Sequence, residues 1–275
     1  MATNKTIVLV TGANTGIGYE TVKALYESST PHTILMGSRS LDKAHEAIKK
    51  IQTDVPSSPS EILPVQIDIE DDASIEKLSQ FIESTYGKLD ALVNNAGGSF
   101  DRLMFATPTP TPNVIRSAWS KTYSLNVTST EVLTQTLAPL LLKSTAAHAR
   151  LLFITSGLSS LTEVARGRVA VTAGPVSPGW PKNPFPSQIT YRASKVALNM
   201  LMLEWERVLQ VDGVKVFCIS PGFLATGLGG VGKEKLASLG AAHPEVGGRL
   251  IRDVVEGRRD EDAGKVVAGS GMQEW

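Results

Sequence analysis

The segment YRASK (residues 191–195) places a phenol and an ammonium at a spacing that could support proton transfer. Tyr191 and Lys195 are at positions i and i+4, so a helix would present both on one face. A free tyrosine has a pKa near ~10 and is a poor acid or base at neutral pH. At about 4 Å and an effective dielectric near 20, an ammonium favours the phenolate by roughly 4 kcal/mol, which corresponds to about three pKa units. The pair is therefore a candidate general acid–base site, although this spacing also arises by chance.

Three further segments carry polar side chains that could work with this pair. Ser156 ends an expected strand in FITSG, where its hydroxyl could hold a substrate carbonyl oxygen or cap a turn. Asn126 stands within a long helical region, and asparagine is a weak helix former. It could bend that helix and hold a water, or face solvent. The segment PGFLAT, with Pro221, Gly222 and Thr226, could contact the carboxamide of a nicotinamide.

A glycine-rich turn, TGANTGIG (residues 11–18), follows the first expected strand and leads into a helix. Glycines let the backbone turn tightly and approach a pyrophosphate, which the helix N-terminus stabilises. The spacing is not G-x-G-x-x-G, and an ordinary strand–helix turn is the alternative. The candidate cofactor contacts in this turn are Gly12, Asn14, Thr15, Gly16, Ile17 and Gly18.

Residues after the next expected strands favour NADP(H) over NAD(H). An NAD site places a carboxylate after the second strand, whereas this chain has Ser38 and Arg39 there. Arginine can bind a 2′-phosphate through charged hydrogen bonds, but it could also simply be solvated. Asp68, after the third strand, could accept from the adenine amino group or cap the next helix. After the fourth strand comes NNAG, in which Asn95, Ala96 and Gly97 could contact the cofactor or only form a turn.

Short apolar runs alternate with helical patterns, which predicts an α/β fold with a doubly wound parallel sheet of six to seven strands and helices on both faces. The strands are expected at TIVLVT (6–11), TILMGS (33–38), EILPVQI (61–67), LDALVNN (89–95), RLLFITS (150–156) and VKVFCIS (214–220), with KVVA (265–268) as a seventh at an edge. The helices are expected at about 17–28, 41–53, 72–86, 114–143 and 188–211.

Three irregular stretches border the carboxyl ends of these strands, where ligands bind in such sheets. They are a loop at 97–112, a proline-rich insertion at about 157–188 and a Gly- and Ala-rich substrate lid at about 222–249. With no linker or repeat, residues 1–275 are predicted to form one domain. The stretches carry apolar side chains that either line a substrate pocket or pin the loops to the core: Met104, Phe105, Trp180, Phe185, Phe223 and Leu224.

Together and in this order, the motifs TGANTGIG, NNAG, Asn126, Ser156, YRASK and PGFLAT resemble the short-chain dehydrogenase/reductase family in its compact, single-domain branch, over residues 5–226. The resemblance implies a Rossmann-type fold and NADP(H) as cofactor. It implies that Tyr191 donates or accepts the proton and that Lys195 lowers its pKa and holds the nicotinamide ribose. It also implies that Ser156 orients the carbonyl and that Asn126 supports a water in the proton relay.

Composition sets the remaining limits. Lys+Arg and Asp+Glu balance at 27 each, so neither nucleic acid nor an anionic membrane is expected as a partner. The lone cysteine and the absence of a signal-like N-terminus or a spanning segment favour a cytoplasmic protein. The histidines form no cluster, so no metal site is expected. The long Ser156–Tyr191 interval resembles an insertion in some monomeric carbonyl reductases, which leaves monomer and homodimer open.

The predicted function is NADPH-dependent reduction of a ketone or aldehyde, with Tyr191 as the general acid. One alternative is an NADP-dependent alcohol dehydrogenase working oxidatively. Another is a regulatory protein that senses NADP(H) on the same fold, against which the complete set of proton-relay residues argues. An epimerase or dehydratase is disfavoured because little chain follows Thr226 to build a larger substrate domain. A second glycine motif, GLGGVG (227–232), does not directly follow a strand, so we interpret it as part of the lid.

Overall fold

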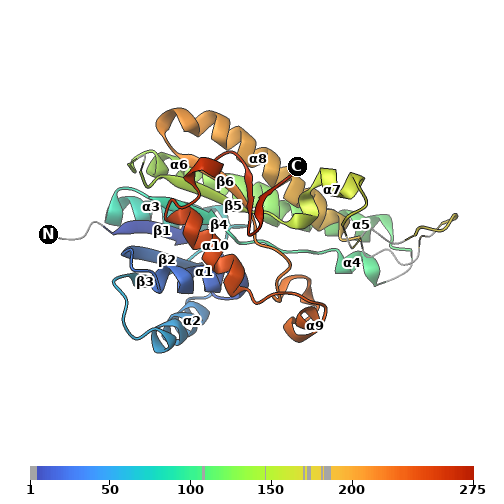
Figure 1. Ribbon diagram of the computed structural model, residues 1–275, viewed down its shortest axis with the longest axis horizontal. Helices are drawn as coiled ribbons and strands as arrows, with labels where there is room; N and C mark the ends of the chain where they lie inside the picture. Colours follow the sequence, from blue (N-terminus) through green and yellow to red (C-terminus); the bar gives the residue numbers. More distant parts are fainter. Residues whose placement is uncertain are drawn as a thin grey trace.

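The computed structural model describes residues 5–106, 109–145, 147–169, 171, 175–180, 182 and 187–275. One sheet of eight strands runs through the molecule in the order β3-β2-β1-β4-β5-β6-β7-β8 (Figure 1). Strands β1 to β7 are parallel, and β8 pairs antiparallel with β7. The strands are β1 Thr6–Val10, β2 His32–Ser38, β3 Glu61–Gln66, β4 Ala91–Asn94, β5 Arg150–Ile154, β6 Lys215–Ser220, β7 Val266–Ala268 and β8 Gly271–Gln273.

Helices cover both faces of the sheet and enclose two apolar cores. One core lies under α1 (Gly16–Tyr26), α2 (Leu41–Asp54) and α10 (Glu245–Val255). The other lies under α3 (Asp72–Tyr86), α6 (Ser129–Leu141) and α8 (Ile189–Leu209). The strands contribute side chains to both, because successive residues point to opposite faces. The remaining helical segments are α4 (Arg102–Phe105), α5 (Pro112–Tyr123), η1 (Ser124–Thr128), η2 (Gly157–Ser159), α7 (Leu161–Ala165), η4 (Gln210–Asp212), η5 (Leu228–Gly230), α9 (Lys233–Ser238) and η6 (Asp260–Asp262).

The predicted α/β sheet is confirmed, but the side of the sheet beyond β6 differs from the prediction. The expected run 265–268 forms β7, which lies next to the edge rather than at it. The edge is β8, which the sequence analysis missed. A short connection at Gly269-Ser270 joins β7 to β8, and Gly271 has a φ of 127°. The three-residue strand is too short to show an alternating pattern of its own.

Two helical predictions also need correction. The region expected as one helix at 114–143 is α5, a π-helical turn and α6, with Asn126 inside the π-helical turn η1. The stretch expected to be an irregular lid at 222–249 contains α9 and the first turn of α10. Helix α10 was not predicted from the sequence, because Gly247 and Gly248 lie within it and glycine is a poor helix former. A β-carbon on Gly248 would collide with the Glu20 backbone, so this glycine permits α10 to approach α1 closely.

The strand order reverses beside β1, whose neighbours are β2 and β4. The segments that leave the carboxyl ends of β1 and β4 therefore diverge toward opposite faces and border a crevice. TGANTGIG, NNAG, Ser156 and PGFLAT follow strand ends on this edge, and YRASK and Asn126 lie on α8 and η1 beside it. The topology thus predicts one site at the carboxyl edge.

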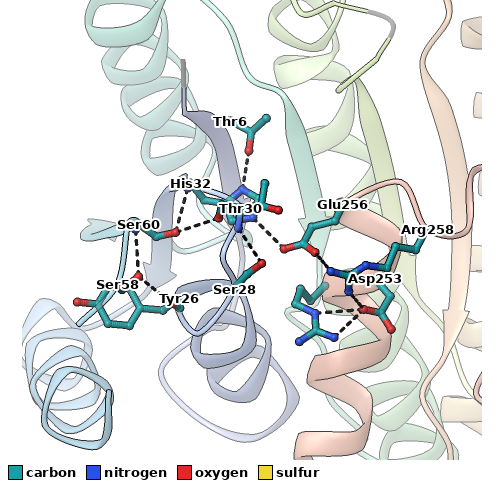
Figure 2. A network of polar contacts seen from close by, with 11 residues as sticks. Thr6, Tyr26, Ser28, Thr30, His32, Ser58, Ser60, Asp253, Glu256 and Arg258 are labelled. Carbon is teal, nitrogen blue, oxygen red and sulfur yellow. Dashed lines mark hydrogen bonds and ion pairs between the residues drawn. The ribbon is translucent and has the colours of Figure 1, made fainter. Parts of the chain in front are cut away.

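A buried polar network lies at the amino ends of β1 and β2 (Figure 2). The His32 ring, at the start of β2, contacts Thr6 Oγ1 through Nδ1 at 2.5 Å and Glu256 Oε1 through Nε2 at 3.2 Å. Glu256 Oε2 lies 2.6 Å from the Arg258 guanidinium. Burial alone would raise the pKa of Glu256, but hydrogen bonds from His32 and Ser28 and the Arg258 charge hold it below its ordinary value. The network ties the end of α10 to β1 and β2.

This network gives a pH-dependent prediction for stability. Because the folded pKa of Glu256 is below its ordinary value of 4.5, its contribution is complete above that pH and is lost as pH falls through the lowered folded value. We expect Glu256→Gln to reduce the free energy of unfolding by about 1–3 kcal/mol at pH 7. The difference from the unmodified chain should shrink below pH 4.5. Urea unfolding across this range measures it.

The matched control is Glu204→Gln, since Glu204 is paired with Arg207 on the exposed face of α8. That change should leave the free energy of unfolding nearly unchanged, because water and salt screen an exposed ion pair. A Glu256→Gln deficit that stays constant from pH 7 to pH 4 would contradict the electrostatic role of Glu256.

Candidate active site

The turns that follow β1 and β4 are fastened to each other. Thr11 Oγ1 accepts hydrogen bonds from the backbone N–H groups of Asn95 (3.1 Å) and Ala96 (3.0 Å). In return, Asn95 Nδ2 donates to the carbonyls of Thr11 (2.8 Å) and Gly12 (3.2 Å). The Asn95 side chain therefore holds the glycine-rich turn in place. Asn95 is one of the predicted cofactor contacts, whereas Thr11 is not among them.

The glycine-rich turn requires glycine for two different reasons. Gly12 and Gly16 have φ values of 61° and 60°, in the left-handed region. A β-carbon on Gly18 would lie 2.5 Å from Asn95 Nδ2 and 2.6 Å from the Gly12 carbonyl. Thr15, the N-cap of α1, makes no side-chain cap hydrogen bond. The first turn of α1 is therefore left able to receive an anion such as a phosphate.

Residues of the PGFLAT segment lie beside this turn. A β-carbon on Gly16 would lie 3.9 Å from Thr226 Cβ. Pro221 is buried, and Gly222 is exposed with a φ of 96°. The Thr226 hydroxyl accepts from the Leu228 N–H at 3.3 Å. The segment after β6 thus faces the start of α1 across the crevice.

The second strand ends in a polar groove. Ser38 is buried and donates to Asn14 Oδ1 at 3.2 Å, whereas the neighbouring Arg39 is exposed. Arg39 lines a groove together with Gln66, Asp68, Asp71, Ala73, Ser74, Glu76, Lys77 and Gln80. Asp68 Oδ1 accepts from the Glu70 N–H at 3.1 Å, and the N-cap of α3 is Asp71. The helix cap that was an alternative role for Asp68 therefore belongs to Asp71.

Tyr191, Lys195 and Ser156 meet at the carboxyl edge of β5. Tyr191 and Lys195 are buried on α8, at 7% and 5% exposure. The Ser156 side chain hydrogen-bonds with the Tyr191 phenol, and its Oγ also accepts from the Leu158 N–H at 3.2 Å. Lys195 Nζ donates to the Ile154 carbonyl at 2.7 Å and lies 5.6 Å from the centre of the Tyr191 ring. Ser156 thus both caps the turn and contacts the phenol.

The Asn126 amide holds the segment after β4. Its Oδ1 accepts from the Gly98 N–H at 2.8 Å. Its Nδ2 donates to the Gly98 carbonyl at 2.8 Å and to Ser194 Oγ at 2.9 Å. A β-carbon on Gly97 would lie 2.9 Å from Asn126 Oδ1 and 3.5 Å from Lys195 Nζ. Gly97 therefore lies against both side chains. Support of a relay water by Asn126 stays a prediction.

Burial is the largest influence on the pKa values of Tyr191 and Lys195. It raises the pKa of Tyr191 to about 12, and the hydrogen bond with Ser156 offsets only part of this effect. Burial lowers the pKa of Lys195 to about 8. The sequence analysis expected Lys195 to bring the pKa of Tyr191 toward neutrality. In this structure that expectation is wrong, because it omitted the desolvation of the phenol, which raises its pKa.

Asp101 is a residue of the site that sequence reasoning missed. Its carboxylate is 1% exposed and accepts from the N–H groups of Thr190 (2.9 Å) and Tyr191 (3.1 Å). It also accepts from the hydroxyls of Thr190 (2.8 Å) and Ser99 (3.0 Å). Helix α8 has no side-chain cap from its own N-cap residue, Gln188, whose φ is 49°. Asp101 therefore caps α8 from another part of the chain, directly at Tyr191.

The segments expected to enclose a substrate only partly match the prediction. Arg102 NH1 donates to the carbonyl of Gly230 at 2.7 Å, which joins α4 to the GLGGVG stretch. Met104 and Leu224 are buried, each at 7% exposure. Of the six apolar residues named in these stretches from the sequence, Phe105, Trp180 and Phe223 are exposed. Phe185 lies outside the described residues. Within the proline-rich insertion, residues 170, 172–174, 181 and 183–186 also lie outside them.

Comparison with known proteins gives the family. The family model for short chain dehydrogenase matches residues 6–167 and 158–236. Short-chain dehydrogenase/reductase tropE of Talaromyces stipitatus is 43% identical over 272 residues, covering 98% of this chain and 97% of that protein. Short-chain dehydrogenase/reductase eupG of a Phoma species is 43% identical over 281 residues, with 98% of each chain covered. The crystal structure of NADPH-bound carbonyl reductase from chicken fatty liver shares the fold with a TM-score of 0.74 and 24% identity, covering 98% of this chain and 99% of that one.

The fold is that of a Rossmann-type oxidoreductase. The chain belongs to the short-chain dehydrogenase/reductase family, which confirms the resemblance noted in the sequence. Within the described ranges, no group of three or more His, Cys, Asp or Glu side chains could hold a metal ion. Across the same part of the chain, we find no helix with the length and apolarity to cross a membrane.

The Asp101 cap gives a prediction for local stability. Asp101→Ala removes the acceptor of two buried N–H groups and two hydroxyls, so we expect a loss of about 2–4 kcal/mol in the free energy of unfolding. Asp101→Asn keeps one acceptor oxygen and should lose less. Amide hydrogen exchange should accelerate at Thr190 and Tyr191 in Asp101→Ala. Asp42→Ala, on the exposed first turn of α2, is the control and should change stability by less than about 0.5 kcal/mol. Unchanged exchange at Tyr191 would show that Asp101 does not hold the start of α8.

Proposed function

We propose that the chain is an NADPH-dependent carbonyl reductase that converts a ketone or aldehyde to an alcohol. The observation that carries the proposal is the contact of Ser156 with the buried Tyr191 phenol, beside Lys195 and at the edge where the glycine-rich turn lies. A protein that only senses a nucleotide needs the turn but not this proton-donating group. The carbonyl reductase from chicken fatty liver, which shares this fold and binds NADPH, supports the same function.

The residues present fit a dinucleotide along this edge. The pyrophosphate would lie against the backbone of residues 12–18, where Gly12 and Gly16 adopt left-handed conformations and Gly18 leaves room for no side chain. Arg39, exposed in its groove, would bind a 2′-phosphate, and Asp68 would accept from the adenine. Gly97, Lys195 and Thr226 would border the nicotinamide end. The bound NADPH would supply the hydride.

Each side chain then has a defined part in the proton transfer. The Ser156 hydroxyl would orient the substrate carbonyl oxygen next to the phenol. A pKa of about 12 keeps Tyr191 protonated at neutral pH, so it can donate to the developing alkoxide, which is a stronger base than a phenolate. Lys195, with a pKa of about 8, is mostly protonated at neutral pH and would stabilise the phenolate that remains. The reverse sequence at the same groups would oxidise an alcohol.

We further propose that the chain forms one domain and works in the cytoplasm as a monomer or homodimer. One continuous sheet includes strands from Thr6 to Gln273, which supports the single domain. The only cysteine, Cys218, is buried and free, as suits a reducing compartment.

The direct test is NADPH consumption against a panel of ketones, aldehydes and quinones, with Tyr191→Phe as the matched variant. Phenylalanine keeps the ring and removes only the proton donor. We expect kcat to fall by at least about a hundredfold, the usual contribution of a general acid, with little change in the Kd for NADPH. Binding of NADPH is followed by its fluorescence.

Turnover that survives in Tyr191→Phe would rule out the tyrosine as the acid. Binding of NADPH by the unmodified chain without reduction of any compound would favour the sensing alternative. Phe81, an exposed aromatic residue on α3, supplies the control Phe81→Leu, which should keep full activity.

The cofactor preference has its own test at Arg39. Loss of a charged hydrogen bond to the 2′-phosphate costs about 1.5–3 kcal/mol, so Arg39→Ala should raise the Kd for NADPH by about tenfold to a hundredfold. The Kd for NADH, which has no 2′-phosphate, should hardly change. Lys49→Ala, an exposed lysine on α2, is the control for net charge. Equal loss of affinity for both nucleotides, or tighter binding of NADH than NADPH by the unmodified chain, would contradict the role of Arg39.

A further inference from the structure

The hairpin of β7 and β8 brings a distant part of the chain to the candidate serine. In the antiparallel pairing, Val266 is opposite Gln273 and Ala268 is opposite Gly271. Side chains alternate along a strand, so Met272 and Gln273 point to opposite sides. Met272 is 56% exposed, whereas Gln273 is partly buried. Gln273 is therefore the β8 residue that faces the protein.

The Gln273 amide contacts the turn that follows β5. Its Nε2 donates to the carbonyl of Ser156 at 3.3 Å and to Ser159 Oγ at 3.4 Å. A β-carbon on Gly157 would lie 3.8 Å from Gln273 Oε1. The amide thus lies against the three-residue turn that the Ser156 side chain caps. It contacts the serine through the backbone carbonyl and not through the hydroxyl that meets Tyr191.

Ser159 connects this contact to a buried network under the site. Ser159 Oγ donates to the Ser156 carbonyl at 2.7 Å and accepts from Asn199 Nδ2 at 3.1 Å. Thr155 Oγ1 lies 2.8 Å from Asn199 Oδ1 and 3.2 Å from the Lys195 carbonyl. Thr155, Ser159 and Asn199 are all at most 5% exposed. The backbones of Ser156 and Lys195 are therefore held by one set of hydrogen bonds, and Gln273 is its outermost member.

Two further contacts hold the same segment to the hairpin. The Thr162 N–H donates to the Trp275 carbonyl at 2.7 Å, and Ser160 Oγ donates to the same oxygen at 3.2 Å. Glu274 forms an ion pair with Arg166. These contacts lie beyond the serine turn, along α7. They fix the hairpin against this segment and leave Gln273 as the contact with Ser156 itself.

We propose that Gln273 is a positioning residue for catalysis, which sets the Ser156 hydroxyl against the Tyr191 phenol by holding the Ser156 carbonyl and Ser159. The inference rests on the proposed function, because it assigns a role to Ser156 in carbonyl reduction. Gln273 touches neither the phenol nor Lys195 Nζ, so it acts only through the turn. Without its amide donor, the turn keeps the Ser159 hydrogen bonds but loses its contact with β8.

The experiment is a double-mutant cycle with Ser156→Ala. Gln273→Ala removes the donor, and Gln273→Glu has the same size but cannot donate. We expect each to lower kcat by about tenfold, equivalent to about 1.4 kcal/mol, with the Kd for NADPH unchanged. In a Ser156→Ala background, neither should lower kcat further, because there is no hydroxyl left to position. The controls are Met272→Ala on the opposite side of β8 and Glu274→Ala, which removes only the exposed ion pair.

A second readout needs no turnover. The N–H of Leu158 is bonded to Ser156 Oγ and that of Ser159 to the Ser156 carbonyl. Amide hydrogen exchange at both should accelerate in Gln273→Ala and stay unchanged in Met272→Ala. If the chain reduces no carbonyl compound but the exchange responds, the proposed function has failed and the structural link holds.

Three results would overturn the inference. The first is full activity and unchanged exchange in Gln273→Ala. The second is an equal loss of kcat with and without the Ser156 hydroxyl, which would place the effect of Gln273 elsewhere. The third is the same loss of kcat in Glu274→Ala, which would show general loosening of the hairpin rather than positioning by the amide.

Discussion

Burial of the Tyr191–Lys195 pair is the constraint on which the arrangement of the site depends. A buried ammonium loses its hydration, and a buried phenol resists ionisation. The protein compensates the lysine with the Ile154 carbonyl, an acceptor at the end of a central strand. It compensates the phenol with the Ser156 hydroxyl. Both partners, the Ile154 carbonyl and the Ser156 hydroxyl, lie at the carboxyl end of β5, so this strand positions them at once.

Helix α8 must also be held in a fixed position relative to the carboxyl end of β5. Two contacts do so from different directions. Asp101 caps the first turn of α8, and Asn126 reaches Ser194 from the π-helical turn η1. Asn126 also holds Gly98, and Asp101 follows three residues later, so the segment after β4 is linked to α8 at both points. A shift of α8 would therefore disturb the segment from Gly98 to Asp101 that follows β4.

Local sequence patterns were sufficient to predict the buried strands, the glycine-rich turn and the YRASK segment. The buried strands are continuous apolar runs, and the glycine-rich turn and the YRASK segment each lie within a few residues, so their geometry follows from local structure. Asp101 and Gln273 could not be found in this way, because their partners are distant in the chain and contact them through the backbone. An acidic residue in a loop or a glutamine in a short strand has no pattern that marks such a role. The pKa of Tyr191 also depends on burial, which spacing alone does not reveal.

The hairpin at residues 266–275 has a consequence for the order in which the protein is made. Synthesis proceeds from the N-terminus, and domains begin to fold as they emerge. β5 and the turn with Ser156 are translated well before β8, so the nascent chain can form most of the sheet while this turn still lacks one of its supports. Completion of the turn then waits for residues 271–275 to leave the ribosome. A message cut short just before these codons would encode nearly the whole sheet, yet its product would lack the strand that carries Gln273.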